Sequence, residues 1–198
     1  MTVKPGHSPL TPSKKMSHLA GKILIATPSL VDPNFCQTVI LLVQDTDEGA
    51  VGLILNRPSD KTVRHLWKSI FHTDVATDQP LNLGGPVFGP LMMLHTRQEL
   101  ADLEIGNGLF FSTQKDYIER VVNDNLQPYK LFLGHSGWGE GQLRSEINEG
   151  AWLRLPAHRV LVFSDDDELW QRLLQHAGQL SLLRVLNTDK LPDDPMVN

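Results

Sequence analysis

The sequence predicts a mixed α+β fold with an antiparallel or mixed sheet. Its 198 residues are 40% hydrophobic and 21% charged, which is typical of a globular chain. Two apolar runs, residues 38–44 and 50–56, are joined by the short polar turn DTDEG, a pattern typical of a β-hairpin. Further along, strand-like runs alternate with segments whose apolar residues recur at spacings of three and four, as in amphipathic helices. Hairpins and interleaved helices together favour the α+β class.

Pattern and composition divide the chain into a leader, one domain and a tail. Residues 1–18 are rich in Pro, Ser, Thr and Lys and lack apolar periodicity, so we expect a disordered leader. The periodic segments predict a single domain over residues 19–180, followed by a weakly structured C-terminal tail at 181–198. The leader has no apolar core of a secretory signal, and no run approaches the ~18 apolar residues of a transmembrane helix.

Charge and cysteine content narrow the class of protein further. The net charge is −5 with a pI near 5.9, and the basic residues are scattered. Direct nucleic-acid binding is therefore not expected, because such proteins usually carry a basic patch. The single cysteine, Cys36, excludes an intramolecular disulfide and suits a reducing compartment. We predict a cytoplasmic protein that does not bind membranes.

The first half of the chain contains the clearest elements. Residues 22–26 are mostly apolar and β-branched, and the Asp32-Pro33 turn ends that segment before the hairpin. Residues 61–71 are expected to form a short amphipathic helix. Gly84 and Gly85 mark a loop over residues 82–90 with special backbone geometry.

The second half alternates strands and helices. Ser112 or Thr113 is expected to cap a helix that runs to about Asn123, with Asp116 placed as in a capping box. Acidic residues 165–167 are expected in the first turn of a helix that ends near Gly178. A two-turn helix is expected over residues 141–149, and strands at residues 91–94, 109–112, 130–133 and 160–163.

The stretch LFLGHSGWGEGQL (131–143) raises the question of a serine hydrolase. A strand leads to Ser136, a helix follows, and acidic residues and His176 come later, which is the order of the catalytic triad in α/β-hydrolases. The position two after the serine must be small for a nucleophile elbow, however, and here it is Trp138. The helix also begins about five residues too late. A structural loop is favoured: its glycines supply positive φ or close backbone approach, Trp138 fills the core, and Gln142 and Glu146 share one helix face.

Other chemistry-bearing residues favour structural interpretations. No two histidines are spaced as metal ligands, so we expect no metal and no cofactor. His95 is expected in the core or at its rim, where it could face the Gly84-Gly85 loop. Cys36 is interpreted as a small apolar residue, and Arg57 as the solvent-facing end of a strand. The acidic run Asp165 to Glu168 lacks the spacing of a calcium loop and is interpreted as a helix start.

The motifs GKILIATPSLVDPNFCQTVILLVQDTDEGAVGLILNRPS, LNLGGPV, MMLHT and FLGHSGWGEGQLRSEINEGAWL together resemble the YqgE/AlgH family of bacterial proteins. The resemblance covers about residues 19–163. It implies a bifurcated sheet that closes into a pseudo-barrel with flanking helices, and no established enzymatic activity. Some members are called transcriptional regulators. The sequence departs from the family at its C-terminus and at His135-Ser136. The family's signature residues fall on Gly84, Gly85, Pro86, Gly137, Trp138, Gly139, Gln142, Leu143, Glu146 and Trp152.

These observations lead to one functional hypothesis and two alternatives. We expect a non-enzymatic protein in which the two glycine loops, at Gly84-Gly85 and residues 137–141, shape one surface that binds a partner protein or a small ligand. No catalytic residue is assigned. The alternatives are a hydrolase that uses Ser136 and a regulator that binds DNA directly.

Overall fold

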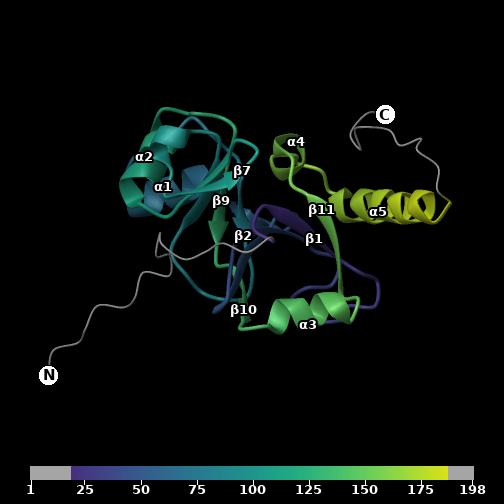
Figure 1. Cartoon of the computed structure of the whole chain (residues 1–198). Coiled ribbons are helices and arrows are strands. Elements are labelled where there is room, and N and C mark those ends of the chain that lie inside the picture. Colours follow the sequence, from purple (N-terminus) through teal and green to yellow (C-terminus); the bar gives the residue numbers. More distant parts are fainter. Residues whose placement is uncertain (1–18, 187–198) are drawn as a thin grey trace, which may run out of the picture.

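The computed structural model describes residues 19–186, which fold into two β-sheets with surrounding helices (Figure 1). The predicted leader, and the part of the predicted tail after residue 186, lie outside the described residues. The α+β class is confirmed. The pseudo-barrel implied by the family resemblance stays a prediction. None of the described helices combines the length and apolarity that crossing a membrane would require.

The first sheet has five strands and is antiparallel throughout. The predicted hairpin lies at its centre, where two neighbouring strands bury nearly all of their apolar side chains on both faces. In spatial order, the strands are β10 (Ser136–Gly139), β3 (Gly49–Ile54), β2 (Val39–Thr46), β1 (Lys22–Ala26) and β11 (Trp152–Pro156).

The second sheet has six strands and is mixed. Its β5/β9 pair is parallel, whereas the other pairs are antiparallel. In spatial order, the strands are β4 (Pro58–Thr62), β5 (Pro80–Leu83), β9 (Tyr129–Leu133), β6 (Met92–His95), β8 (Leu109–Ser112) and β7 (Leu103–Gly106).

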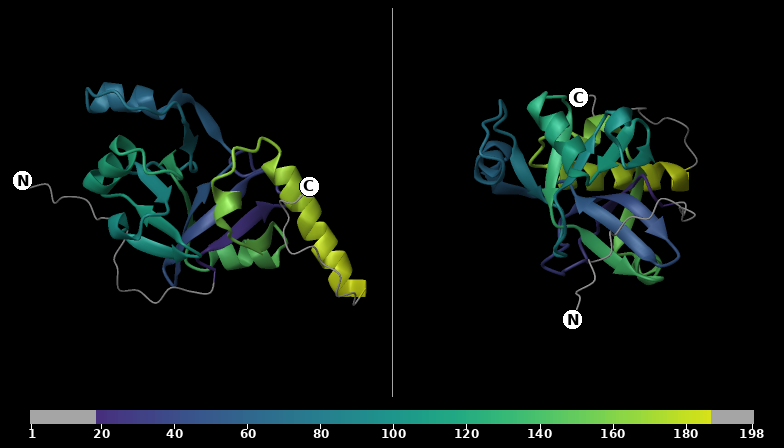
Figure 2. Two further views of the ribbon diagram at one scale, coloured as in Figure 1. Left: turned by 90° about the horizontal axis from the view of Figure 1, so that it is seen from above. Right: turned by 90° about the vertical axis from the view of Figure 1, so that its left-hand side faces the viewer.

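Helices cover the outer faces of both sheets. Two of them pack on the six-stranded sheet, and one seven-residue helix packs on the five-stranded sheet. The last helix lies at the other end of the molecule from the first (Figures 1 and 2). The helices are α1 (Val63–Ile70), the 3-10 helix η1 (Gln98–Leu100), α2 (Lys115–Asn123), α3 (Gln142–Asn148), α4 (Arg159–Val162) and α5 (Leu169–Leu186).

Three apolar clusters form the core. The largest lies between the sheets, where side chains such as Ile25 and Leu41 meet Phe111 and Phe132, and α4 and α5 close one side. A second cluster lies between the six-stranded sheet and α1 and α2, around the buried Trp67. The third lies between the five-stranded sheet and α3. The molecule is therefore layered as two helices, the six-stranded sheet, the five-stranded sheet and one helix, with α4 and α5 at one side.

Several predicted elements are wrong. Residues 160–163 form helix α4 and the turn after it, because a four-residue apolar run does not distinguish a strand from a buried helical turn. Strands β4, β5, β7 and β11 were not predicted, since they are short or carry few apolar residues.

The predicted ends of helices α2 and α5 also differ from those in the structure. The cap of α2 comes from Asp102, whose carboxylate accepts the backbone N–H groups of Thr113 (2.7 Å) and Gln114 (3.2 Å), so the predicted capping box is wrong. Helix α5 begins at Leu169, which leaves acidic residues 165–167 in the preceding loop, and it continues past Gly178 into the predicted tail.

Candidate functional site

Ser136 lies in strand β10 rather than in a loop. Residues 136–139 pair with β3, from Ser136 opposite Gly52 to Gly139 opposite Gly49, so the predicted loop is wrong here. The sequence did not indicate this strand, because two of its four residues are glycines and glycine weakens the interior of a strand. The Ser136 side chain is fully buried, and its hydroxyl donates to the carbonyl oxygen of Gly84 at 3.1 Å. A buried hydroxyl in an extended strand does not have the geometry of a nucleophile elbow.

Gly84 joins the two sheets. It follows β5, and its N–H donates to Leu133 at the end of β9 (2.9 Å). Its carbonyl accepts the N–H of Ile54 at the end of β3 (3.0 Å) as well as the Ser136 hydroxyl. The chain itself crosses from β9 to β10 through Gly134 and His135 at the same place. Four strands from both sheets are therefore connected around one residue.

The Gly84-Gly85 loop approaches Gly134 and His135 so closely that side chains are excluded between them. A Cβ atom on Gly84 would lie 2.3 Å from the carbonyl oxygen of Gly134, and one on Gly85 would lie 2.3 Å from the carbonyl carbon of His135. Gly85 also has a positive φ of 152°. By contrast, a Cβ on Gly137 would meet Val87 at an ordinary 3.7 Å. The glycines at 84 and 85 are thus required by backbone packing, and the glycine at 137 is not.

The loop after Gly85 exposes an apolar tip. Its base is held by paired backbone hydrogen bonds between Val87 and His135 (3.0 and 2.9 Å). Beyond that pair, the side chain of Phe88 is 99% exposed, and Val87 and Leu83 are 42% and 44% exposed. We call the exposed group of Leu83, Pro86, Val87, Phe88 and Gly137 the crossover face.

The remaining signature residues form a hydrogen-bonded network beneath α3. One carboxylate oxygen of Glu146 accepts the indole N–H groups of both Trp138 and Trp152, each at 2.9 Å. Its other oxygen accepts the amide of Gln142 at 2.9 Å, which confirms that these two residues share a helix face. The Gln142 carbonyl in turn accepts the N–H of Gly139 at 3.0 Å. One carboxylate thus fastens α3 to β10 and β11.

Aromatic packing completes this network. The rings of Trp138 and Trp152 meet edge to face at 6.1 Å, and Phe35 stacks on Trp138 at 6.0 Å. Both indoles and Leu143 are nearly fully buried, as predicted for Trp138. The predicted site residues therefore separate into two groups that β10 connects: Gly84, Gly85, Pro86 and Gly137 at the crossover, and Trp138, Gly139, Gln142, Leu143, Glu146 and Trp152 in the network.

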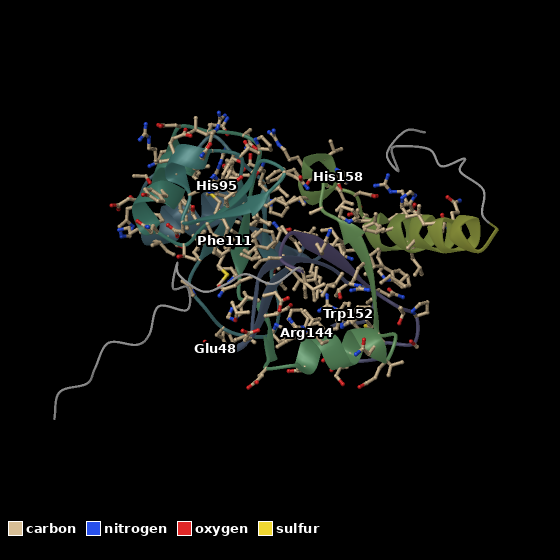
Figure 3. The ribbon with its side chains drawn as sticks, in the orientation of Figure 1. Glu48, His95, Phe111, Arg144, Trp152 and His158 are labelled. Atoms are coloured by element: carbon tan, nitrogen blue, oxygen red, sulfur yellow. The ribbon has the colours of Figure 1, made fainter. Side chains whose placement is uncertain are left out.

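His95 is a buried histidine of the six-stranded sheet, far from the network around Trp152 (Figure 3). Its Nδ1 accepts the N–H of Arg97 at 3.2 Å, so Nε2 of the neutral ring carries the proton and donates to the Ser112 hydroxyl at 2.9 Å. Ser112 donates to the carbonyl of Leu100 at 2.6 Å. Burial lowers the pKa of His95 to about 4. The expected core position is confirmed, but His95 bonds to Ser112 of β8 and to Arg97, and not to the Gly84-Gly85 loop.

The other singled-out residues have structural contacts. Arg57 is not a solvent-facing end, because its guanidinium donates to the carbonyls of Asn34 (2.6 Å), Pro33 (3.3 Å) and Cys36 (3.4 Å) and fixes that loop. Asp166 forms an ion pair with Arg172. Within residues 19–186, no group of three or more histidine, cysteine, aspartate or glutamate side chains is arranged to hold a metal ion.

Sequence reasoning missed a nearly buried lysine in β9. The amine of Lys130 donates to the carbonyl of Ser164 at 2.6 Å and lies 3.4 Å from the Asp165 carboxylate. Burial lowers the pKa of this amine, and Asp165 acts in the opposite direction. A cavity of about 270 Å³ opens beside it. The sequence did not indicate that this lysine is buried, because the residues that it contacts lie in a loop about 34 residues further along the chain.

Sequence reasoning also missed Asp45, near the end of β2. Its side chain is buried and lines a second cavity of about 270 Å³ that borders Gly139 and Leu143 of the predicted site. An acidic residue just before a turn is usually exposed, so nothing in the sequence indicated this position.

Residues 23–181 match a family model described as AlgH-like. A UPF0301 protein of Chlorobaculum tepidum is 36% identical over 179 residues, which cover 87% of this chain and 93% of the relative. A UPF0301 protein of Ruegeria pomeroyi is 37% identical over 174 residues, covering 83% and 95%. The solution structure of the AlgH protein from Pseudomonas aeruginosa superimposes with a TM-score of 0.67 at 29% identity, covering 95% of this chain and all of that one.

Proposed function

This chain belongs to the AlgH-like family, and we propose that it is a non-enzymatic binding protein whose crossover face engages a partner protein. The exposed Phe88 carries this proposal. A fully exposed aromatic side chain beside two partly exposed apolar ones has no role in the core of this chain, and such patches are typical of interaction sites. Aromatic side chains are also enriched among the residues that dominate binding energy.

The rigidity of the loop base supports the same proposal. The Val87–His135 backbone pair and the close packing of Gly85 fix the backbone at the base of the tip. A preformed tip loses less conformational entropy on binding than a free loop would. The other signature residues act behind this face, because the Glu146 network fixes the strand on which it rests.

The directions of the hydrogen bonds at Ser136 and Ser112 favour a binding role over hydrolysis. The Ser136 hydroxyl is buried and donates to Gly84. The Ser112–His95 pair has the distance of a nucleophile and its base, but the imidazole proton points toward the serine, whose own proton points toward Leu100. Neither serine is therefore activated. The net charge of −5 gives no support to direct DNA binding.

Site-specific photo-cross-linking tests the proposal. A benzoylphenylalanine side chain is placed at position 88, and at Val160 on α4 as a control, since Val160 is also apolar and exposed. In an extract of the cells that naturally contain this protein, we expect a discrete adduct from position 88 only. Excess unlabelled protein should displace it, and Phe88→Ser should compete about 30-fold less well, which corresponds to the loss of about 2 kcal/mol. The same adduct from position 160, or equal competition by Phe88→Ser, would refute the proposal.

A further inference from the structure

A cavity of about 270 Å³ opens at the end of the five-stranded sheet, where the β2–β3 turn meets the segment before α3. Figure 3 shows Glu48 of that turn and Arg144 of α3 at this end of the molecule. The polar residues that line the cavity are Asp45, Thr46, Asp47, Glu140 and Arg144. This site uses none of the residues of the crossover face.

A β-bulge turns Asp45 into the cavity. Leu42 pairs with Gly52, but Gln44 pairs with Val51 and Asp45 with Ala50, so β2 contains one extra residue at this point. Residues opposite each other on paired strands share a face of the sheet. Because Ala50 is also opposite Trp138, the Asp45 side chain projects on the face that α3 covers. Bulges often re-aim a side chain in this way next to binding sites.

The Asp45 carboxylate is incompletely satisfied in this position. The residue is 4% exposed, and its Oδ2 atom is buried with no hydrogen-bond partner in the described part of the chain. A buried oxygen without a donor costs free energy, so it indicates a group that binds there. Burial raises the pKa of Asp45 and nearby Asp47 raises it further, whereas Arg144 and the backbone N–H of Leu19 lower it.

The charges around the cavity define the complementary ligand. Three carboxylates, on Asp45, Asp47 and Glu140, line it together with one guanidinium, that of Arg144. The described side chains offer no metal-binding group of three ligands at any place. A cationic N–H donor satisfies both requirements, because it supplies the missing hydrogen bond and reduces the excess negative charge. The apolar Ala50 and Leu143 leave room for a short alkyl chain.

We propose that this cavity binds an organic cation, a primary ammonium or a guanidinium, which donates an N–H to the free Oδ2 of Asp45. The group would come either from a free small amine or from the side chain of a lysine or arginine on another protein. Both sources share the chemistry that the cavity recognises.

Amide chemical shifts of the full chain provide the test. The probes are 1,4-diaminobutane and methylguanidinium, with 1,4-butanediol and methylurea as neutral controls of matched shape. We expect saturable shifts at residues 45–47 and 139–141 with the cations only. N-acetyl-lysine methylamide is added as a third cation: saturation by the diamine at lower concentration identifies a free amine, and the reverse order identifies a protein side chain.

Two variants connect the binding to Asp45. Asp45→Asn should weaken cation binding at least about tenfold, because it removes the charge from a buried hydrogen bond. Asp60→Asn is the control, since it makes the same change of net charge at an exposed position of β4. Arg144→Gln, which removes the competing guanidinium, should tighten binding and provides an independent test if Asp45→Asn does not fold. Equal shifts with the neutral probes or with Mg²⁺, no saturation, or equal weakening by Asp60→Asn would overturn the proposal.

Discussion

Glu146 explains why the signature residues of this chain include two tryptophans and one glutamine. Its carboxylate accepts three N–H groups, from Trp138, Trp152 and Gln142, which belong to three different elements. Buried indole N–H groups need an acceptor, and a carboxylate can serve several donors at once. The interpretation of these residues as structural therefore has a specific physical basis. They position β10, which leads from the crossover face to the Asp45 cavity.

Glu146→Gln should lower the free energy of unfolding by about 1–3 kcal/mol, because an amide offers one acceptor oxygen and turns a competing donor toward Trp138, Trp152 or Gln142. Urea unfolding followed by tryptophan fluorescence measures the loss. Glu149→Gln is the matched control at the C-terminal cap of the same helix, where an exposed carboxylate accepts one bond from Ser145 at 2.8 Å. The control should change stability by less than about 0.5 kcal/mol. Equal effects of the two substitutions would contradict the network's importance.

Strand β10 shows how an element can be built from residues that disfavour it. Its sequence, SGWG, has weak β-propensity, and the strand forms because β3 supplies a full register of partners on one side. At the start of the strand, the Ser136 hydroxyl donates to the carbonyl of Gly84. At its end, the N–H of Gly139 donates to the side-chain carbonyl of Gln142. Tertiary contacts at both ends thus replace local propensity.

Gly85→Ala should destabilise the fold by at least about 2 kcal/mol, because its Cβ would collide with the backbone of His135 and the φ of Gly85 is positive. Gly137→Ala is the matched control, since it adds the same methyl group two residues after His135, where Val87 lies at 3.7 Å. We expect the control to change stability by less than about 1 kcal/mol. Thermal unfolding followed by circular dichroism compares the two. Similar melting temperatures would show that Gly85 is not closely packed against His135 in solution.

The molecule as a whole combines two sheets whose inner faces share one apolar core with helices on both outer faces. Several buried polar side chains within these layers have a defined donor or acceptor role, as in the His95–Ser112–Leu100 chain. The stability of the assembly therefore depends on these groups keeping one protonation state.

Stability should fall with acidification between pH 6.5 and 4, in part through His95. Its pKa is about 4 in the folded state and 6.5 ordinarily, because burial disfavours the charged ring; Arg97 lowers it further, while Asp102 and Glu99 act in the opposite direction. The unfolded chain therefore binds more protons in this window, and stability is lost as the pH falls through it, by up to about 1.4 kcal/mol per pH unit.

Denaturant titrations across this pH range of the parent chain and of His95→Gln measure that slope. The variant should lose the His95 component, whereas His65→Gln, which changes an exposed histidine of α1, should retain it. An unchanged slope in His95→Gln would contradict the assignment.

Much of the fold could be read from local patterns. The central hairpin, strands β1, β6, β8 and β9 and helices α1 and α2 were identified from apolar runs or apolar spacing, and α3 from its place after the glycine-rich stretch, apart from their exact ends. The motif series also identified the family. The objections to Ser136 as a nucleophile came from the size of Trp138 and the late start of the next helix, and the buried Ser136 hydroxyl agrees with them.

The remainder depended on contacts between segments that are distant in sequence. Strand β10 needs β3, the cap of α2 needs Asp102, and the Gly84-Gly85 loop meets Gly134 and His135 only when the sheets pack. Asp45 lies in a cavity because one extra residue in β2 reverses which face its side chain occupies. Apolar spacing along the chain specifies which residues are buried, because burial follows the period of each element. The register of the strands and the crossover between the sheets decide which polar groups meet. Only the assembled sheets define both, and with them the surfaces that could bind a ligand or partner.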